Sequence, residues 1–266
     1  MRIARFVTAD GRVCTGRLID ERTAQALVGD LFSNPRFEGP PLTIARWLAP
    51  VQPPNIFAIG RNYRAHAAET GSAVPEKPMI FGKPTTAVIA TGETIFIPAC
   101  APNEIDFEAE LAIVIGHTTR RVAPPAAIQH VFGYTCANDV SARDCQKSDK
   151  QWTRAKGFDT FCPLGPWLVT ADEISPQSLS VRSRLNGQVM QNASTRDMIH
   201  SCAELISYLS HQFTLLPGTL ILTGTPEGVG MARTPPVFLK PGDRIEIEIE
   251  GIGVLSNPVA GESALD

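Results

Sequence analysis

The chain has 266 residues, enough to bury a substantial core as one large domain or as one domain with a small addition. Its formal net charge of -3 and its 19% of charged residues give no electrostatic reason to expect binding to nucleic acid or to an anionic membrane. No stretch approaches the roughly 20 apolar residues of a membrane-spanning helix. We therefore expect a cytoplasmic protein that acts on neither nucleic acid nor membrane.

Two further features of the composition limit the possible fold classes. The 6 cysteines are scattered without a C-x-x-C pair, which favours reduced, buried thiols over disulfides or a zinc site. The 22 prolines and 21 glycines divide the apolar residues into many short runs, which favours a β-rich architecture over a helical bundle.

Residues 1–50 are predicted to form a small separate N-terminal domain, and residues 51–266 the main domain. Arg2–Ala9 and Arg12–Ile19 are expected to be two strands around an Asp-Gly turn, followed by a helical piece. Leu42–Leu48 is predicted to be a short helix before a proline-rich linker. Nothing in this unit suggests chemistry, and we expect it to serve packing or oligomer contacts.

The main domain begins with a strand, N-I-F-A-I-G, followed by a predicted helix that carries His66 and Glu69. Residues three apart on a helix share a face, and a carboxylate beside a histidine orients the ring and raises its basicity. This pair is a candidate general base for activating water, and an exposed ion pair is the alternative. Gly60 and Gly71 flank the segment and would allow it to move as a lid.

Lys83 interrupts the apolar run Pro78–Gly92 in a Gly-Lys-Pro turn. From this loop it could meet an anionic ligand, and a surface lysine is the alternative.

The stretch Glu104–Gly116 alternates acidic and apolar residues before it becomes wholly apolar, so a strand would carry four carboxylates on one face. We expect the acidic half to run from a buried region into something open. Carboxylates crowded in a cleft need positive compensation, which a hard cation such as Mg²⁺ supplies, and Glu108 and Glu110 lie nearest the buried half. Arg244–Glu250 shows the same alternation and is most simply a half-exposed strand, so alternation alone leaves both interpretations open.

Two later stretches add candidates. In Y-T-C-A-N-D-V-S-A-R-D-C-Q, Asp139 falls at the end of a predicted strand, Ser141 could cap the following turn, and Arg143 and Gln146 would share a face of it. Asp139 could reach a ligand there or serve only the loop. Lys156 lies among aromatic residues and is either an electrostatic clamp for an anion or a side chain that extends to water.

The C-terminal third contains a predicted core helix opened by Ser194 and Asp197, and then the buried strand Leu220–Leu222. The glycine-rich turn T-G-T-P-E-G-V-G follows this strand and could present backbone N–H groups and the Thr225 hydroxyl to an anion. It lacks the P-loop pattern, and no dinucleotide, zinc-protease or serine-hydrolase motif occurs.

Taken together, these stretches resemble the fumarylacetoacetate hydrolase family, in particular its short bacterial acylpyruvase and fumarylpyruvate hydrolase-like members. The matching motifs occur in the family's order: G-R-N-Y-R-A-H-A-A-E, I-F-G-K-P-T-T-A, D-F-E-A-E-L-A-I-V-I-G, N-D-V-S-A-R-D-C-Q, K-G-F-D-T-F-C-P-L-G-P-W and L-T-G-T-P-E-G-V-G. The resemblance implies a mainly β fold with some α (α+β), a mixed β-sandwich roll around a central cleft. It also implies a homodimer with Mg²⁺ or Mn²⁺ in the cleft.

The resemblance also implies roles for individual residues. The three metal ligands would be Glu108, Glu110 and Asp139. The catalytic residues would be His66 and Glu69, a water-activating pair on a mobile lid, and Lys156, which stabilises charge. The substrate-binding residues would be Arg143, Gln146, Thr225, Tyr63 and Lys83.

These roles predict a divalent-metal-dependent hydrolase that cleaves a C–C bond in 1,3-dicarbonyl 2-oxo acids such as acylpyruvates and fumarylpyruvate, in the catabolism of aromatic or carboxylic acids. The same residues could serve an oxaloacetate-type decarboxylase or a 2-oxo acid isomerase or tautomerase. The non-enzymatic alternative is a metal-stabilised binding protein.

Overall fold

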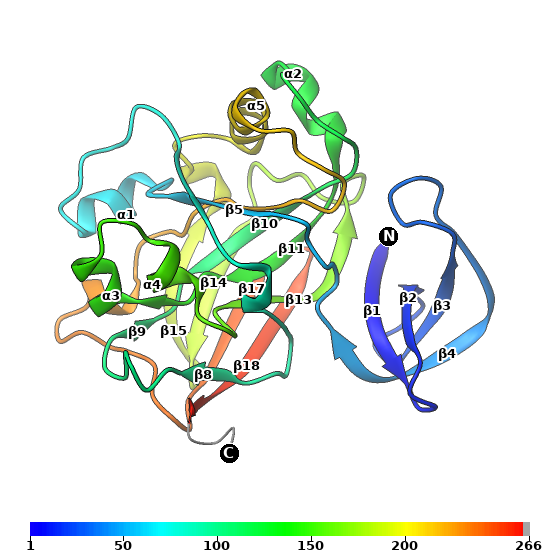
Figure 1. Ribbon diagram of the computed structural model, residues 1–266, viewed down its shortest axis with the longest axis horizontal. Helices are drawn as coiled ribbons and strands as arrows, with labels where there is room; N and C mark the ends of the chain where they lie inside the picture. Colours follow the sequence, from blue (N-terminus) through cyan, green and yellow to red (C-terminus); the bar gives the residue numbers. More distant parts are fainter. Residues whose placement is uncertain (263–266) are drawn as a thin grey trace.

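The computed structural model describes residues 1–262, and most of its regular structure is strand (Figure 1). The strands of the N-terminal half are β1 Arg2–Thr8, β2 Val13–Leu18, β3 Thr23–Val28, β4 Arg36–Leu48, β5 Ile56–Gly60, β6 Met79–Gly82, β7 Val88–Ala90, β8 Ile95–Ile97, β9 Ile105–Asp106 and β10 Ala109–Ile115. Those of the C-terminal half are β11 Val131–Asn138, β12 Ser141–Ala142, β13 Cys162–Thr170, β14 Ser180–Leu185, β15 Gln188–Ser194, β16 Leu220–Leu222, β17 Arg244–Ile249 and β18 Gly253–Gly261.

Helices are short and lie around the strands. The α-helices are α1 Arg64–Glu69, α2 Pro124–Ala127, α3 Arg143–Ser148, α4 Thr153–Gly157 and α5 Cys202–Gln212, and the 3₁₀ turns are η1 Thr85–Ala87, η2 Ile128–His130, η3 Thr195–Asp197 and η4 Gly230–Ala232. Within residues 1–262, no helix is both long and apolar enough to cross a membrane. The predicted mainly β, α+β fold class is confirmed.

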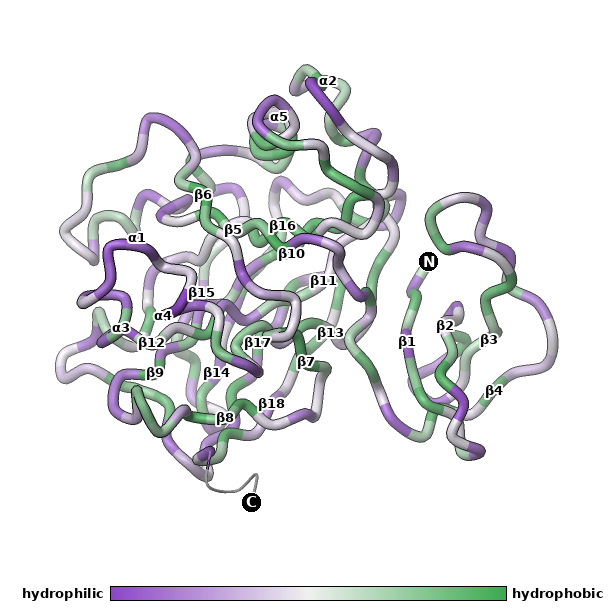
Figure 2. Tube along the Cα trace, viewed as in Figure 1, coloured by the Kyte–Doolittle hydropathy of each residue, from purple (hydrophilic) through white to green (hydrophobic). Residues whose placement is uncertain are grey.

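The largest sheet has 11 strands, with β10 paired to β11 on one side and to β16 on the other. Every residue of β10 is buried, which explains why its sequence A-E-L-A-I-V-I is apolar at nearly every position. Leu111 and Ile113 face the main apolar core, and Ala112 and Val114 face a second apolar cluster on the other side. Figure 2 shows the hydrophobic colour along β5, β16 and β10 in the middle of the molecule.

A second sheet of 5 strands, in the order β15-β14-β17-β18-β8, packs against the first sheet. Its inner face is formed by Ile245, Ile247 and Ile249 of β17, which are each only 1% exposed and join the same core as Leu111. The two sheets therefore form the two layers of a β-sandwich, and α5 covers one end of it (Figure 1).

The first four strands close on themselves, since β1 pairs with β2, β2 with β3, β3 with β4 and β4 with β1. This small closed unit joins the large sheet where Arg2 and Ile3 of β1 pair with β13. The predicted helical pieces in residues 1–50 are wrong, because the segment predicted to be a helix at Leu42–Leu48 is the end of β4. Pairing with β1 and β3 outweighs its local helical pattern. We retain the division at residue 50 as a proposal.

The predicted start of the core helix is also wrong. Ser194 caps only the short turn η3, by accepting a hydrogen bond from the Arg196 N–H. The helix α5 begins at Cys202, where Ser201 and Glu204 form a capping box with reciprocal hydrogen bonds. The reciprocal hydrogen bonds of Ser201 and Glu204, rather than the Ser194 and Asp197 spacing, therefore mark the start of the longer helix.

Candidate metal centre and active site

The acidic stretch is two strands rather than one, because pairing stops between β9 and β10. The Glu108 N–H donates to Asn138 Oδ1 at 3.0 Å, and the Ala109 N–H donates to Gln191 Oε1 at 3.0 Å. These two side-chain oxygens replace the backbone carbonyls that a continuous strand pairing would have provided, so both backbone N–H groups are hydrogen-bonded. The Asp139 N–H donates to the Glu108 carbonyl at 3.0 Å, which holds the end of β11 beside the break.

This geometry gathers three carboxylates. Glu108, Glu110 and Asp139 each offer one oxygen, and these three oxygens lie within 4.8 Å of one another. All three side chains are buried, with relative exposures of 6%, 1% and 0%, and Asp106 is also 0% exposed. The expectation that the acidic half runs from a buried region into an open one is met only at Glu104, whose side chain is 31% exposed, and at Glu108, which lines a cavity, whereas Asp106 and Glu110 are buried.

Two lysines and one arginine compensate the charge of these carboxylates. Lys156 Nζ lies 2.7 Å from Glu108 Oε2 and 2.8 Å from Asp139 Oδ2. Lys83 forms a buried ion pair with the other oxygen of Asp139, and Arg143 Nη2 lies 2.7 Å from Glu108 Oε1. Neither lysine extends to water, so the surface alternatives for Lys83 and Lys156 are wrong.

The carboxylates differ strongly in proton affinity. Burial alone would raise the pKa of Glu108, but Lys156 and then Arg143 outweigh burial and hold that pKa well below its usual value. Burial, and then the charges of Asp139 and Glu108, raise the pKa of Glu110 well above its usual value. The opposite shifts indicate a cluster in which the existing cations satisfy Glu108, while Glu110 lacks a positive partner of its own.

The donor set fits a hard divalent cation. Three carboxylate oxygens within reach of one point are the ligands that Mg²⁺ and Mn²⁺ prefer, and no sulfur or imidazole belongs to the cluster. A doubly charged ion would also supply the positive partner that Glu110 lacks. The described residues thus form a buried acidic triad that could bind a metal ion.

Asp106 lies beside the triad but is used differently. Its oxygens accept hydrogen bonds from Arg143 Nε at 2.9 Å, from the Gly230 N–H at 2.7 Å and from the Met231 N–H at 3.0 Å. Arg143 Nη1 in turn donates to Gln146 Oε1 at 2.9 Å, as expected for residues that share a helical face. Asp106 therefore fixes the guanidinium group rather than a metal.

The predicted pair on α1 forms as expected, with a buried histidine and a glutamate whose side chain is 21% exposed. His66 Nδ1 lies 2.8 Å from Glu69 Oε1, and the His66 side chain is only 9% exposed. The other oxygen of Glu69 accepts the Gly228 N–H at 2.8 Å. Because the carboxylate accepts the Nδ1 proton, Nε2 is the basic nitrogen of the ring.

A cavity of about 210 Å³ lies in front of these groups. Six predicted residues line it: His66, Glu108, Arg143, Gln146, Lys156 and Thr225. The structure thus brings a metal-site carboxylate, the histidine and the cationic side chains into one small enclosed space.

The other predicted residues do not line this cavity: Glu110 and Asp139 lie behind Glu108 in the triad, Glu69 is hydrogen-bonded to His66, and Lys83 and Tyr63 are buried elsewhere around the triad. Lys83 is buried and pairs with Asp139 without lining the cavity. Tyr63 is completely buried, and its hydroxyl has no hydrogen-bond partner in the part of the chain that the structure describes. Burial, and then the charge of Glu110, raise the pKa of Tyr63. A direct substrate contact for either residue stays a prediction that the cavity lining does not support.

The glycine-rich turn binds protein carboxylates. The N–H groups of Gly224, Gly228 and Gly230 donate to Glu110, Glu69 and Asp106 respectively. The Thr225 hydroxyl donates to the Ala109 carbonyl at 3.0 Å and accepts from Gln191 Nε2 at 2.7 Å. The anion that these backbone donors hold is therefore provided by the chain itself.

Three supporting residues were given no role by the sequence: Asp106, Asn138 and Gln191. Asp106 shares the alternation of Glu108 and Glu110, so a signal existed, although it did not separate an arginine partner from a metal ligand. Gln191 comes from β15, 82 positions away from the Ala109 N–H that it accepts, and nothing local marks it. Ser141 does not cap α3, because its hydroxyl donates to the Asp139 carbonyl.

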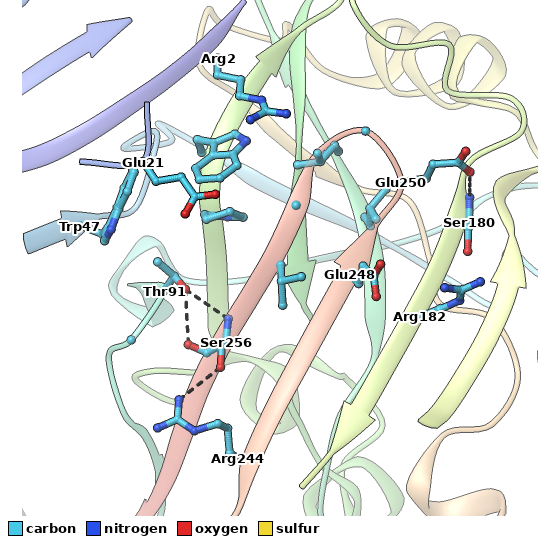
Figure 3. A pocket seen from close by; sticks show the side chains of 18 residues that line it. Arg2, Glu21, Trp47, Thr91, Ser180, Arg182, Arg244, Glu248, Glu250 and Ser256 are labelled. Atoms are coloured by element: carbon cyan, nitrogen blue, oxygen red, sulfur yellow. Dashed lines mark hydrogen bonds between the residues drawn. The ribbon is translucent and has the colours of Figure 1, made fainter. Parts of the chain in front are cut away.

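A larger cavity of about 1020 Å³ lies elsewhere, between the N-terminal strands and the sheet of β17 and β18 (Figure 3). Arg2, Arg182 and Arg244 line it together with the acidic residues Glu21, Glu248 and Glu250. It contains none of the predicted site residues and its charges balance, so size alone does not identify the active site.

Comparison with known proteins gives consistent matches over almost the whole chain. The family model described as fumarylacetoacetate (FAA) hydrolase C-terminal matches residues 55–260, and the model described as Rv2993c-like, N-terminal, matches residues 1–50. Protein Rv2993c of Mycobacterium tuberculosis is 46% identical over 267 residues, covering 97% of this chain and 98% of that protein.

Several relatives carry functional names, among them tautomerases, isomerases and hydrolases. Mitochondrial oxaloacetate tautomerase FAHD2A of Bos taurus is 46% identical over 223 residues, covering 82% of this chain and 71% of that protein. The crystal structure of 5-carboxymethyl-2-hydroxymuconate delta-isomerase from Mycobacterium smegmatis is 42% identical, with a TM-score of 0.88, covering 98% of this chain and 100% of that one.

Proposed function

The chain belongs to the fumarylacetoacetate hydrolase family, and on that premise we propose that it is a divalent-metal-dependent enzyme that tautomerises or isomerises a 2-oxo acid. The observation that carries this proposal is that His66, which is hydrogen-bonded to Glu69, lines the same cavity of about 210 Å³ as Glu108 of the acidic triad. The names of the tautomerase and the delta-isomerase add support, since both reactions move a proton on such an acid.

Glu108, Glu110 and Asp139 hold Mg²⁺ or Mn²⁺ in this proposal. A divalent ion held there would supply Lewis-acid polarisation of the 2-oxo group, which would make the neighbouring C–H bond more acidic. The triad thereby fixes the end of the cavity at which the oxo group and its carboxylate bind.

His66 moves the proton. Its Nε2 removes a proton from the carbon next to the oxo group, and the same nitrogen returns that proton to oxygen or to another carbon, so no co-reactant is needed. Glu69 keeps the Nδ1 proton in place and stabilises the ring while it is positively charged, and the Gly228 N–H holds Glu69 in turn. The ring is buried, so bulk water does not compete for the proton.

Lys156 and Arg143 compensate the negative charge that develops on the substrate. Burial alone would lower the pKa of Lys156, but Asp139 and Glu108 outweigh burial and raise it above its usual value. Lys156 is therefore a permanent cation in the cavity, and such preorganised charge acts more strongly there than in water.

C–C bond hydrolysis, the reaction expected from the sequence, is the second candidate. The same His66 nitrogen could activate water, and the family's name describes this chemistry. Hydrolysis needs room for a water molecule beside the remote carbonyl in addition to the substrate. The cavity is smaller than the roughly 300–1,000 Å³ of drug-sized ligand sites. This size favours tautomerisation of a short acid, which needs no water molecule as a second reactant, over hydrolysis.

The test compares both reactions in one protein. Interconversion of enol and keto oxaloacetate, followed by the ultraviolet absorbance of the enol, is measured beside cleavage of an acylpyruvate, each with Mg²⁺ and with a chelator. We expect metal-dependent tautomerisation and little cleavage, whereas metal-dependent cleavage without tautomerisation would establish the second candidate.

A substitution tests the role of the histidine. His66→Asn should lower kcat about 100-fold or more, the lower limit for a general base, while Mn²⁺ binding measured by calorimetry stays unchanged. His117→Asn is the matched control, because His117 is exposed and lies outside the cavity. Full activity of His66→Asn would contradict the proposed proton transfer.

A further inference from the structure

Arg61 lies between β5 and α1 and lines the same cavity as His66 and Lys156. Its backbone has a φ of 57°, in the left-handed region that residues other than glycine seldom adopt. Such a conformation persists only where the surroundings enforce it, and it is often retained where a side chain has a task.

The other cations that line the cavity already have carboxylate partners. Lys156 pairs with Glu108 and Asp139, Arg143 pairs with Asp106 and Glu108, and Lys147 Nζ lies 2.6 Å from Glu104 Oε2. Within residues 1–262, Arg61 is the one cation of the lining with neither an ion pair nor a side-chain hydrogen bond. Its positive charge is therefore available to a ligand.

Trp152 supports the arginine. The guanidinium carbon lies 5.9 Å from the centroid of the Trp152 ring, which also lines the cavity. The ring packs so closely on Gly60 that a Cβ there would lie 2.6 Å from a ring carbon. An arginine held over an aromatic ring keeps its donors directed sideways, in the planar arrangement that matches a carboxylate.

We propose that Arg61 binds the distal carboxylate of the substrate, so that the enzyme acts on short 2-oxo dicarboxylic acids. This inference rests on the proposed function, in which the triad end of the cavity binds the 2-oxo carboxylate. A second carboxylate entering a cavity of about 210 Å³ needs a cation that is not already neutralised, and Arg61 provides it. Arg61 thereby determines substrate specificity rather than proton transfer.

The experiment compares two four-carbon acids that differ only at the far end. Oxaloacetate carries a terminal carboxylate where 2-oxobutanoate carries a methyl group, and their binding is measured by calorimetry on the Mg²⁺-loaded full-length chain. The wild-type protein should prefer oxaloacetate. Arg61→Met should weaken oxaloacetate about 10- to 100-fold, the usual range for losing a charged hydrogen-bonded partner, and should change 2-oxobutanoate less than about 3-fold.

Two further variants control the result. Arg64→Met removes an exposed arginine of the same segment that does not line the cavity, and it should change neither affinity. Arg61→Gly relieves the left-handed backbone, so it should retain or raise the Tm and still lose the preference for oxaloacetate. Equal weakening of both acids by Arg61→Met, an unchanged preference, or binding of neither acid by the wild-type protein would overturn the inference.

Binding and turnover separate this inference from the function on which it rests. If the wild-type protein prefers oxaloacetate through Arg61 but tautomerises nothing, the proposed function fails and the specificity site stands. If it tautomerises oxaloacetate and Arg61→Met leaves the KM unchanged, the specificity site fails alone.

Discussion

The segment from β9 to β10 and the strand β17 both alternate acidic with apolar residues, and the structure uses them in opposite ways. In β17 the isoleucines are buried, while Glu246 and Glu248 lie on a half-exposed outer face. Arg184 pairs with Glu248 there, with about a third of each side chain exposed or less. In the segment from β9 to β10 the strand β10 is buried along its whole length, and Glu108 and Glu110 are buried, with Lys156 and Arg143 paired to Glu108.

The difference shows what a pattern of acidic residues needs before it forms a metal centre. A carboxylate on a surface strand is solvated, and an ion pair there contributes little free energy. A carboxylate between two layers loses its water and must find cations or hydrogen-bond donors. The number of covered faces, rather than the alternation, separates the two strands.

The largest expected effect is on folding stability. Lys83→Met leaves one oxygen of the buried Asp139 without its cation, which should cost about 3–5 kcal/mol in the free energy of unfolding. Arg184→Met removes the corresponding cation beside β17 and should cost about 1 kcal/mol or less. Urea denaturation of both variants measures the difference, and equal losses would show that burial does not separate the two strands.

The next effect concerns metal binding. Glu110→Gln keeps the shape of the side chain and an oxygen for the Gly224 N–H, but it removes a ligand charge. Mn²⁺ affinity should fall about 100-fold, equal to about 2.7 kcal/mol, with little change in the stability of the metal-free protein. Glu246→Gln on β17 should leave the affinity unchanged, and calorimetric titration of both variants would reveal any metal site on that outer face.

A smaller effect is expected from the glutamine that supports the break between β9 and β10. Gln191→Ala removes the acceptor of the buried Ala109 N–H and should cost about 1–3 kcal/mol of stability. The loss should be accompanied by weaker Mn²⁺ binding, because Ala109 separates two ligands. Gln188→Ala, an exposed position of the same strand, is the control; a stability loss with unchanged Mn²⁺ affinity would show that Gln191 does not position the ligands.

The smallest effect is a dependence on pH. The folded-state pKa of Glu110 is raised above its unfolded value, so its contribution favours the metal-free fold at low pH and is lost as the pH rises through the raised pKa. The Tm of the metal-free protein should therefore fall, and the Tm increase caused by Mg²⁺ should grow, over the pH range above about 4.5, the ordinary pKa of a glutamate. A Mg²⁺ effect on Tm that is the same across this range would exclude proton release from Glu110.

The sequence by itself determined a good part of this protein. Local sequence patterns predicted the strand β5, the helix α1 that carries His66 and Glu69, the buried strand β16 and the half-exposed strand β17. These elements were predictable because turn residues and apolar periodicity act over only a few positions. The motifs also singled out, through a family resemblance, the three acidic residues that the fold brings together.

The tertiary structure decided the rest, because the deciding contacts join residues far apart in the chain. Pairing with β1 and β3 made Leu42–Leu48 a strand. Lys83 reaches Asp139 across 56 positions, and Gln191 reaches Ala109 across 82. Local periodicity records which face of a strand is apolar, but whether the opposite face meets water, an arginine or a metal ion depends on what the fold places over it.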